Sequence, residues 1–123
     1  MARSYRELLV WQKAKALAVQ TYQATEQFPR TETYGLTSQI RRAAVSVSSN
    51  IAEGQGRLTL GEFQHFLGQA RGSLLELDSQ LAIAQDLNYL RPDRYETLDR
   101  DAYQVLGLLN RLIESPPPCA RSL

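Results

Sequence analysis

The chain has 123 residues, of which 43% are hydrophobic and 22% are charged, and its formal net charge is +1. A chain of this length forms one domain with a core large enough to fold without a metal ion or a disulfide. The near-neutral charge gives no global field that attracts nucleic acid, and no run approaches the roughly eighteen apolar residues that span a membrane. The single cysteine, Cys119, excludes an internal disulfide, and the N-terminus has no signal-peptide pattern, so we expect a cytoplasmic protein.

The charge is distributed unevenly along the chain. Residues 1–30 carry five basic and two acidic side chains, a balance of +3, and residues 58–90 carry one basic and four acidic side chains, a balance of −3. This difference either polarises the surface or is compensated between neighbouring helices.

The first helix is predicted over residues 5–27. Apolar residues recur there at spacings of three and four, which is the helical period. The helix ends at Phe28 because the residue before Pro29 is disfavoured in helical conformation. The residues expected to face the core are Trp11, Ala14, Leu17, Ala18, Thr21 or Tyr22, and Phe28.

The second helix is predicted over residues 32–53, with Thr31 as its N-cap and Gly54 as a left-handed C-cap. It carries two stripes. The apolar stripe consists of Leu36, Ile40, Ala44, Val47 and Ile51. The second stripe, about 120° around the helix, is polar and consists of Gln39, Arg42, Ser46, Asn50 and Glu53. A surface helix needs only the first stripe.

The third helix is predicted over residues 60–89 and the fourth over residues 92–114. Thr59 and Glu62 form a capping box, and Pro92 suits a first helical position. The third helix carries a heptad seam of Phe63, Leu67, Ala70, Leu74, Leu77, Leu81 and Ala84. The fourth has a similar stripe of Tyr95, Leu98, Ala102, Val105, Leu109 and Leu112. Three interior glycines of the third helix suggest close helix approach: Gly61, Gly68 and Gly72.

Short connections between four helices predict an all-α fold, an antiparallel up-down-up-down four-helix bundle over residues 1–115. Residues 116–123, which begin with three prolines, are expected to form a disordered tail.

No constellation of residues predicts catalysis or a cofactor. Glu62 and His65 form a Glu-x-x-His element, but a di-metal bundle needs that element twice and the chain has one histidine. Cys119 has no nearby base, and the glycines around Gln55 lack the strand and spacing of a dinucleotide site. Glu53 and Glu76 are more simply read as hydrogen-bond acceptors than as an acid–base pair. We therefore expect a protein that is not an enzyme and that has no metal site.

Four ordered motifs resemble a known family. They are YRELLVWQKA at residues 5–14, FPRTETYGL at 28–36, QIRRAA followed by NIAEG at 39–54, and GSLLELDSQLAIAQDLNYL at 72–90. Together they resemble the small bacterial four-helix-bundle proteins associated with intervening sequences of 23S rRNA genes. This family is related to the accessory protein of diversity-generating retroelements, which binds nucleic acid. The resemblance implies a homopentamer and a link to RNA or DNA.

Two functional hypotheses remain. In the first, an oligomeric, non-catalytic protein binds nucleic acid through Lys13, Lys15, Arg41, Arg42 and Arg57, mainly at phosphates. In the second, a homo-oligomeric adapter binds a protein partner and no nucleic acid. The polar stripe has the same two interpretations: it fixes helix register or a subunit interface, or it binds a partner. Neighbouring Arg41 and Arg42 point about 100° apart, and we expect Arg42 to be the more structural of the two.

Overall fold

The computed structural model describes residues 4–116, and within this range the chain is helical and contains no strand. The elements are η1 (Tyr5–Glu7), α1 (Leu9–Thr25), η2 (Arg30–Glu32), α2 (Leu36–Gln55), α3 (Leu60–Asp86) and α4 (Pro92–Glu114), where η marks a short 3₁₀ helix. The predicted all-α fold is confirmed. No helix in the described part of the chain is long and apolar enough to cross a membrane.

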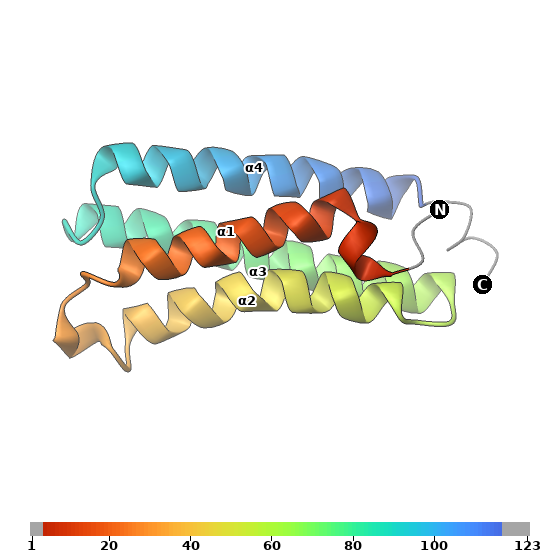
Figure 1. Cartoon of the computed structure of the whole chain (residues 1–123), viewed down its shortest axis with the longest axis horizontal. Coiled ribbons are helices and arrows are strands. Elements are labelled where there is room, and N and C mark those ends of the chain that lie inside the picture. The colour runs from red at the N-terminus through yellow and green to blue at the C-terminus, as the bar shows by residue number, and fades with distance from the viewer. Residues whose placement is uncertain (1–3, 117–123) are drawn as a thin grey trace.

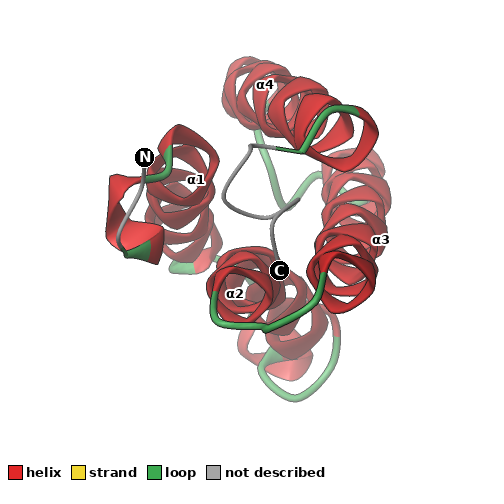
Figure 2. Ribbon diagram, turned by 90° about the vertical axis from the view of Figure 1, so that its right-hand side faces the viewer, coloured by secondary structure: helices red, strands yellow, loops and turns green. Residues whose placement is uncertain are grey.

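The four helices form an antiparallel bundle in which each helix packs against two others. The packed pairs are α1 with α2, α2 with α3, α3 with α4, and α4 with α1, as the view along the bundle shows (Figure 2). The α1–α2 and α3–α4 connections lie at one end of the bundle (Figure 1). η1, the α2–α3 turn and the end of α4 lie at the other end.

The predicted heptad seam of α3 forms the centre of the core. All seven of its residues are at most 2% exposed, and the stripe of α2 is buried apart from Leu36, which is half-buried. In α4, four of the six predicted residues are buried, while Tyr95 and Leu112 are half-buried. These apolar stripes face one another inside the bundle and stabilise it mainly by removing their surface from water.

The inward face of α1 differs in part from the predicted one, and of the alternatives Thr21 and Tyr22 it is Thr21 that faces the core. Val10, Thr21 and Thr25 are buried, whereas Trp11 is half-buried and Tyr22 is 41% exposed. The two threonines can be buried because each hydroxyl donates a hydrogen bond to a carbonyl one turn earlier, at 2.7 Å for Thr21 and 2.9 Å for Thr25. A period of apolar residues does not reveal polar groups that are satisfied in this way.

The first two helices begin later than predicted. Leu8 is extended, with φ −75° and ψ 125°, so it separates η1 from α1. Thr31 is not the N-cap of α2, because it lies within η2. Gly35 takes the N-cap position, and the Glu32 carboxylate accepts a hydrogen bond of 3.1 Å from the Leu36 N–H. A side chain four residues upstream therefore does what a capping threonine usually does.

The predicted role of Gly54 as a left-handed C-cap is wrong. α2 continues through Gln55, and no described glycine has a positive φ. Gly54 is buried against α3, where an added Cβ would lie 3.1 Å from the Phe66 Cβ and 3.3 Å from the Phe63 carbonyl oxygen. Its missing side chain lets α2 and α3 approach each other.

The glycines of α3 do not mediate helix approach within the subunit. A Cβ added at Gly61, Gly68 or Gly72 would meet no atom of the described chain within 4 Å. All three lie on the outer surface of the bundle, so the expectation of close packing there is wrong for a single subunit.

The predicted caps of α3 and α4 are largely confirmed. The Thr59 hydroxyl accepts a hydrogen bond of 3.1 Å from the Glu62 N–H, and α4 begins at Pro92. α3 ends at Asp86 rather than at residue 89, because Asn88 adopts a left-handed conformation with φ 63°. The tail expected over residues 116–123 lies outside the described residues except for Pro116, which is buried.

Candidate nucleic-acid interface

The five cations predicted to bind nucleic acid do not form one surface. Arg41 and Arg42 lie near the start of α2, beside the last turns of α1. Lys13 and Lys15 lie near the start of α1, and Arg57 lies in the α2–α3 turn. Because α1 and α2 are antiparallel, these two groups lie toward opposite ends of the bundle (Figure 1).

Arg41 is held tightly against α1. Its Nε donates a hydrogen bond of 2.8 Å to the Thr25 hydroxyl, and its Nη2 donates one of 3.2 Å to the Tyr22 carbonyl. Its guanidinium carbon lies 4.7 Å from the centroid of the Tyr22 ring, within the range of a cation–π contact.

Arg42 is exposed and makes no hydrogen bond, ion pair or ring contact with another residue of the range 4–116. The expectation that Arg42 is the more structural arginine is therefore wrong: the contacts to α1 belong to Arg41.

An open hollow of about 510 Å³ lies where the α1–α2 connection meets the start of α2. Arg41 and Arg42 line it from α2, and Arg30 lines it from η2. Tyr22 and Tyr34 also border it, and Tyr34 is 97% exposed. Glu26 is the one acidic residue in the lining, so the hollow carries an excess of positive charge.

The lining of this hollow includes the first turn of α2, with Thr37 and Ser38. Amides in the first turn of a helix have no intrahelical carbonyl partner and carry the positive end of the helix dipole. Thr37 is 8% exposed, and its hydroxyl oxygen is buried without a hydrogen-bond partner among the described residues. The hollow therefore combines arginines and helix amides, both of which suit an anionic ligand, and it lies beside a buried hydroxyl that has no partner in the described chain.

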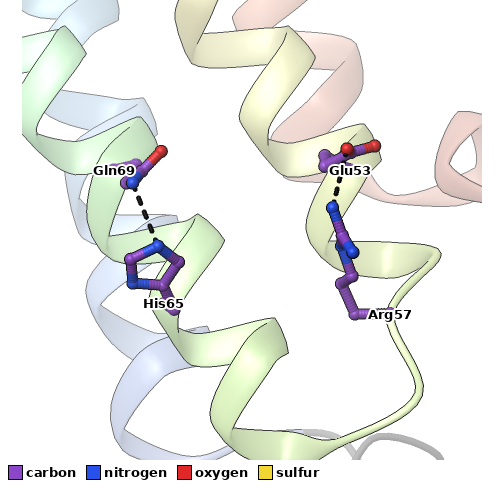
Figure 3. Close-up of polar contacts among 4 residues, drawn as sticks. All are labelled: Glu53, Arg57, His65 and Gln69. Carbon is purple, nitrogen blue, oxygen red and sulfur yellow. Dashed lines mark hydrogen bonds and ion pairs between the residues drawn. The ribbon is translucent and has the colours of Figure 1, made fainter.

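The second group of cations is more fully compensated. The Lys15 amine lies 5.4 Å from the centroid of the Trp11 ring, and Lys13 borders a smaller hollow together with Asp101 of α4. Arg57 donates a hydrogen bond of 2.9 Å to Glu53 (Figure 3). The same guanidinium lies 4.5 Å from the Phe66 ring centroid.

The middle of the polar stripe on α2 connects that helix to α3. The hydroxyls of Ser46 and Ser73 are 2.9 Å apart and share a hydrogen bond. The Asn50 side-chain amide donates to the Ser46 carbonyl at 2.9 Å and to its hydroxyl at 3.0 Å. This cluster supports the register-fixing interpretation for Ser46 and Asn50. Gln39 and Glu53, at the ends of the stripe, are exposed.

The residues considered for other chemistry lie apart. His65 is exposed and shares a hydrogen bond of 3.0 Å with Gln69 (Figure 3). Glu53 and Glu76 each accept a hydrogen bond from a residue four positions later, Arg57 and Gln80. Within residues 4–116, no three His, Cys, Asp or Glu side chains gather where they could hold a metal ion, and Cys119 lies outside this range.

Comparison with known proteins identifies the family. The sequence profile of the 23S rRNA-intervening sequence protein family matches residues 6–111. The chain belongs to this family. A match over this length spans all four helices of the bundle and the connection that forms the hollow.

The fold of this 23S rRNA-intervening sequence protein is also found in a solved structure. It is similar to a crystal structure from Bacteroides thetaiotaomicron, a protein of unknown function from the S23 ribosomal protein family. The two share 22% sequence identity and a TM-score of 0.79, over 87% of this chain and 100% of the other. At 22% sequence identity, this similarity establishes the shared fold alone. No curated protein matches the chain.

Sequence reasoning missed three residues that border the hollow: Arg30, Tyr34 and Thr37. The segment that contains the first two was noted only as part of a family motif. The sequence did contain a signal for this site: a basic and an aromatic residue lie in a short connection, and the Arg41-Arg42 pair follows them. Thr37 gave no signal, because its missing hydrogen-bond partner is visible only in three dimensions.

Proposed function

We propose that this chain is a non-catalytic nucleic-acid-binding protein that acts as a homo-oligomer, a pentamer, and contacts RNA or DNA mainly at phosphates. The observation that supports this most is the hollow at the start of α2, where three arginines face one glutamate. Arginine binds phosphate oxygens with a planar set of donors, so such a cluster suits a polyanion. Membership of a family named for 23S rRNA is consistent with this proposal.

A net charge of +1 per chain is compatible with polyanion binding by an oligomer. A ring of five subunits presents each local basic cluster five times, and a strand that contacts several clusters gains affinity from each. Phosphate binding depends on local charge, because screening limits the reach of each cation to roughly 10 Å.

The alternative function is that of an adapter for a protein partner. One observation favours it: Leu75 and Tyr103, which are 52% and 61% exposed, border a shallow apolar groove between α3 and α4. Apolar side chains exposed together are typical of protein-binding surfaces. This surface and the arginine-lined hollow lie on different helices, so separate variants distinguish the two functions.

Fluorescence anisotropy with a labelled RNA tests the proposed function. We expect binding at low salt that weakens steeply between about 50 and about 200 mM salt, because phosphate contacts release counterions. Replacing Arg30 and Arg42 by alanine should weaken binding for all RNA sequences alike. Replacing Arg100 by alanine, an exposed arginine of α4, is the matched control and should have little effect.

A second variant compares the two basic groups. Replacing Lys13 and Lys15 by alanine tests the cations near the start of α1 and leaves intact the hollow, which Arg41 lines. Loss of binding in this variant together with normal binding of the Arg30 and Arg42 variant would place the interface along α1 instead of at the hollow. No binding at low salt would contradict the proposal and favour the adapter function.

A further inference from the structure

We infer that the hollow at the start of α2 binds one nucleotide unit of a single strand, with its phosphate at the arginines and the first turn of α2 and its base stacked on Tyr34. This inference rests on the proposed function and deepens it, since it names the part of the nucleic acid that the site takes. A volume of about 510 Å³ is within the usual range of small-ligand sites.

The phosphate part of the site is arranged around Arg41. Its bonds to Thr25 and Tyr22 fix the guanidinium, so little conformational freedom is lost when a ligand binds. Arg30 and Arg42 also line the hollow, are exposed, and have no partner among the described residues. Because one fixed cation and two uncommitted ones line the same hollow, an anion of phosphate size can be held by more than one arginine.

The start of α2 supplies a second, independent feature. The Leu36 N–H is already bonded to Glu32, whereas the next residues, Thr37 and Ser38, border the hollow. The Thr37 side chain is more than nine-tenths buried, and its hydroxyl has no partner in the described chain. A buried hydroxyl without a partner destabilises the fold unless a ligand or a water molecule satisfies it. Because this oxygen has almost no accessible surface, a phosphate at the first turn of α2 accepts its hydrogen bond only after the Thr37 side chain rotates toward the hollow.

The base part of the site is Tyr34. Its side chain is 97% exposed and makes no ring contact or hydrogen bond with another residue of the range 4–116. Tyr22, the other tyrosine of the hollow, already has Arg41 over its ring. Tyr34 is therefore the ring on which an incoming base can stack, at the edge of a hollow that holds the phosphate.

This geometry discriminates between single and double strands. The bases of a duplex are stacked on one another and present no free face to a tyrosine, whereas an unpaired base can turn out and stack. A duplex would gain only the phosphate contacts, so we expect a single strand to bind more tightly than a duplex of the same length.

The test uses the full chain and a labelled oligouridylate of about ten nucleotides, with a duplex of equal length for comparison. Tyr34→Ala should weaken single-strand binding about tenfold, the ratio that about 1.4 kcal/mol of stacking gives, and leave duplex binding unchanged. Tyr103→Ala, an exposed tyrosine of α4, is the matched control. Thr37→Val keeps the side-chain shape and removes the hydroxyl, and should weaken both strands, while Thr37→Ser should restore binding.

Different results separate the inference from the proposed function. If the oligonucleotide binds but Tyr34→Ala and Thr37→Val have no effect, the inference is wrong and the general nucleic-acid function stands. If no oligonucleotide binds at low salt, the proposed function is contradicted, and titration with uridine monophosphate, followed by amide NMR shifts of residues 30–42, tests whether the hollow still binds a nucleotide. Shifts in these residues would show a site for free nucleotides. The absence of shifts would overturn the inference as well.

Discussion

The carboxyl groups of Asp78 in α3 and Asp99 in α4 face each other within hydrogen-bonding reach. Burial, the hydrogen bond to Asp99 and the charge of Asp99 together raise the pKa of Asp78 to about 7. One Asp78 oxygen is buried and has no hydrogen-bond partner among the described residues. Tyr95 lies near this pair, and burial together with the charges of Asp99 and Asp78 raises its pKa. The contact between α3 and α4 therefore contains a proton-dependent pair.

The stability of the bundle should fall as pH rises through the neutral range. Asp78 takes up a proton more readily in the folded chain than in the unfolded one, so its contribution is full below about pH 4 and is lost as pH approaches 7. We expect a decrease of about 1 kcal/mol, because Asp78 is only partly buried and solvent screens the repulsion. Urea unfolding at about pH 5 and about pH 8 measures this difference.

Asp78→Asn provides the control for that prediction. The amide keeps the shape of the side chain and carries no charge, so the unfolding midpoint of the variant should depend less on pH and be higher than wild type at about pH 8. Glu96→Gln, at an exposed site of α4, should retain the wild-type pH dependence. An unchanged pH dependence in Asp78→Asn would contradict the role of the pair.

Leu74→Ala should destabilise the bundle by about 2–5 kcal/mol, because it leaves a cavity in the heptad seam of α3. Leu74 is 1% exposed, whereas the adjacent Leu75 is 52% exposed. Leu75→Ala is therefore a control of the same chemistry, and should cost well under 1 kcal/mol. Equal losses for the two variants in chemical denaturation would show that the helix face has been assigned wrongly.

Two glycine-to-alanine changes should have different effects. Gly68→Ala should stabilise the fold of a subunit by up to about 1 kcal/mol, because alanine favours the helix and its Cβ meets no described atom within 4 Å. Gly54→Ala should not stabilise the fold in this way, because the added Cβ would lie 3.1 Å from the Phe66 Cβ. Thermal unfolding of both variants gives the comparison, and a larger gain at Gly54 would refute the close approach of α2 and α3.

The proposed pentamer is tested by light scattering coupled to size exclusion. At micromolar concentration we expect a mass of about five times the 13.9 kDa subunit. The open surface at Gly68 and Gly72 is a place for another subunit to approach, and a bulky change such as Gly72→Trp should then lower the mass while circular dichroism stays helical. A monomer at every concentration would exclude the ring, and a dimer or trimer would retain assembly only.

The sequence was most informative where one physical effect dominates. The leucine seam fixes the inward face of α3, and Pro92 marks the start of α4, because burial and proline geometry allow few alternatives. It was less informative for α1, where Val10 and Thr25 are buried although neither was expected to face the core, and Trp11 is only half-buried. The hydrogen bond of Thr25 to the helix backbone does not depend on apolar character, so periodicity could not detect this residue.

The candidate site was predicted only in part. Arg41 and Arg42 were identified, but their roles depend on which of them contacts the last turns of α1. The local sequence around two neighbouring arginines does not indicate which one makes that contact. Tyr34 lies in the polar segment TETYG, and its exposure follows from the path of the connection between η2 and α2. Properties that arise from packing between separate elements are therefore the ones that the sequence did not reveal.

The up-down order of the helices also determines how the protein can be attached to other molecules. η1 and the end of α4, the first and last helical elements of the described range, lie at the end of the bundle opposite the α1–α2 connection that borders the arginine-lined hollow (Figure 1). The 27 residues of α3 span about 40 Å between these ends. A fluorophore, an affinity tag or a sensor surface attached to η1 or to the last turn of α4 would thus be separated from the hollow by the length of the bundle, and binding could be measured on tethered protein.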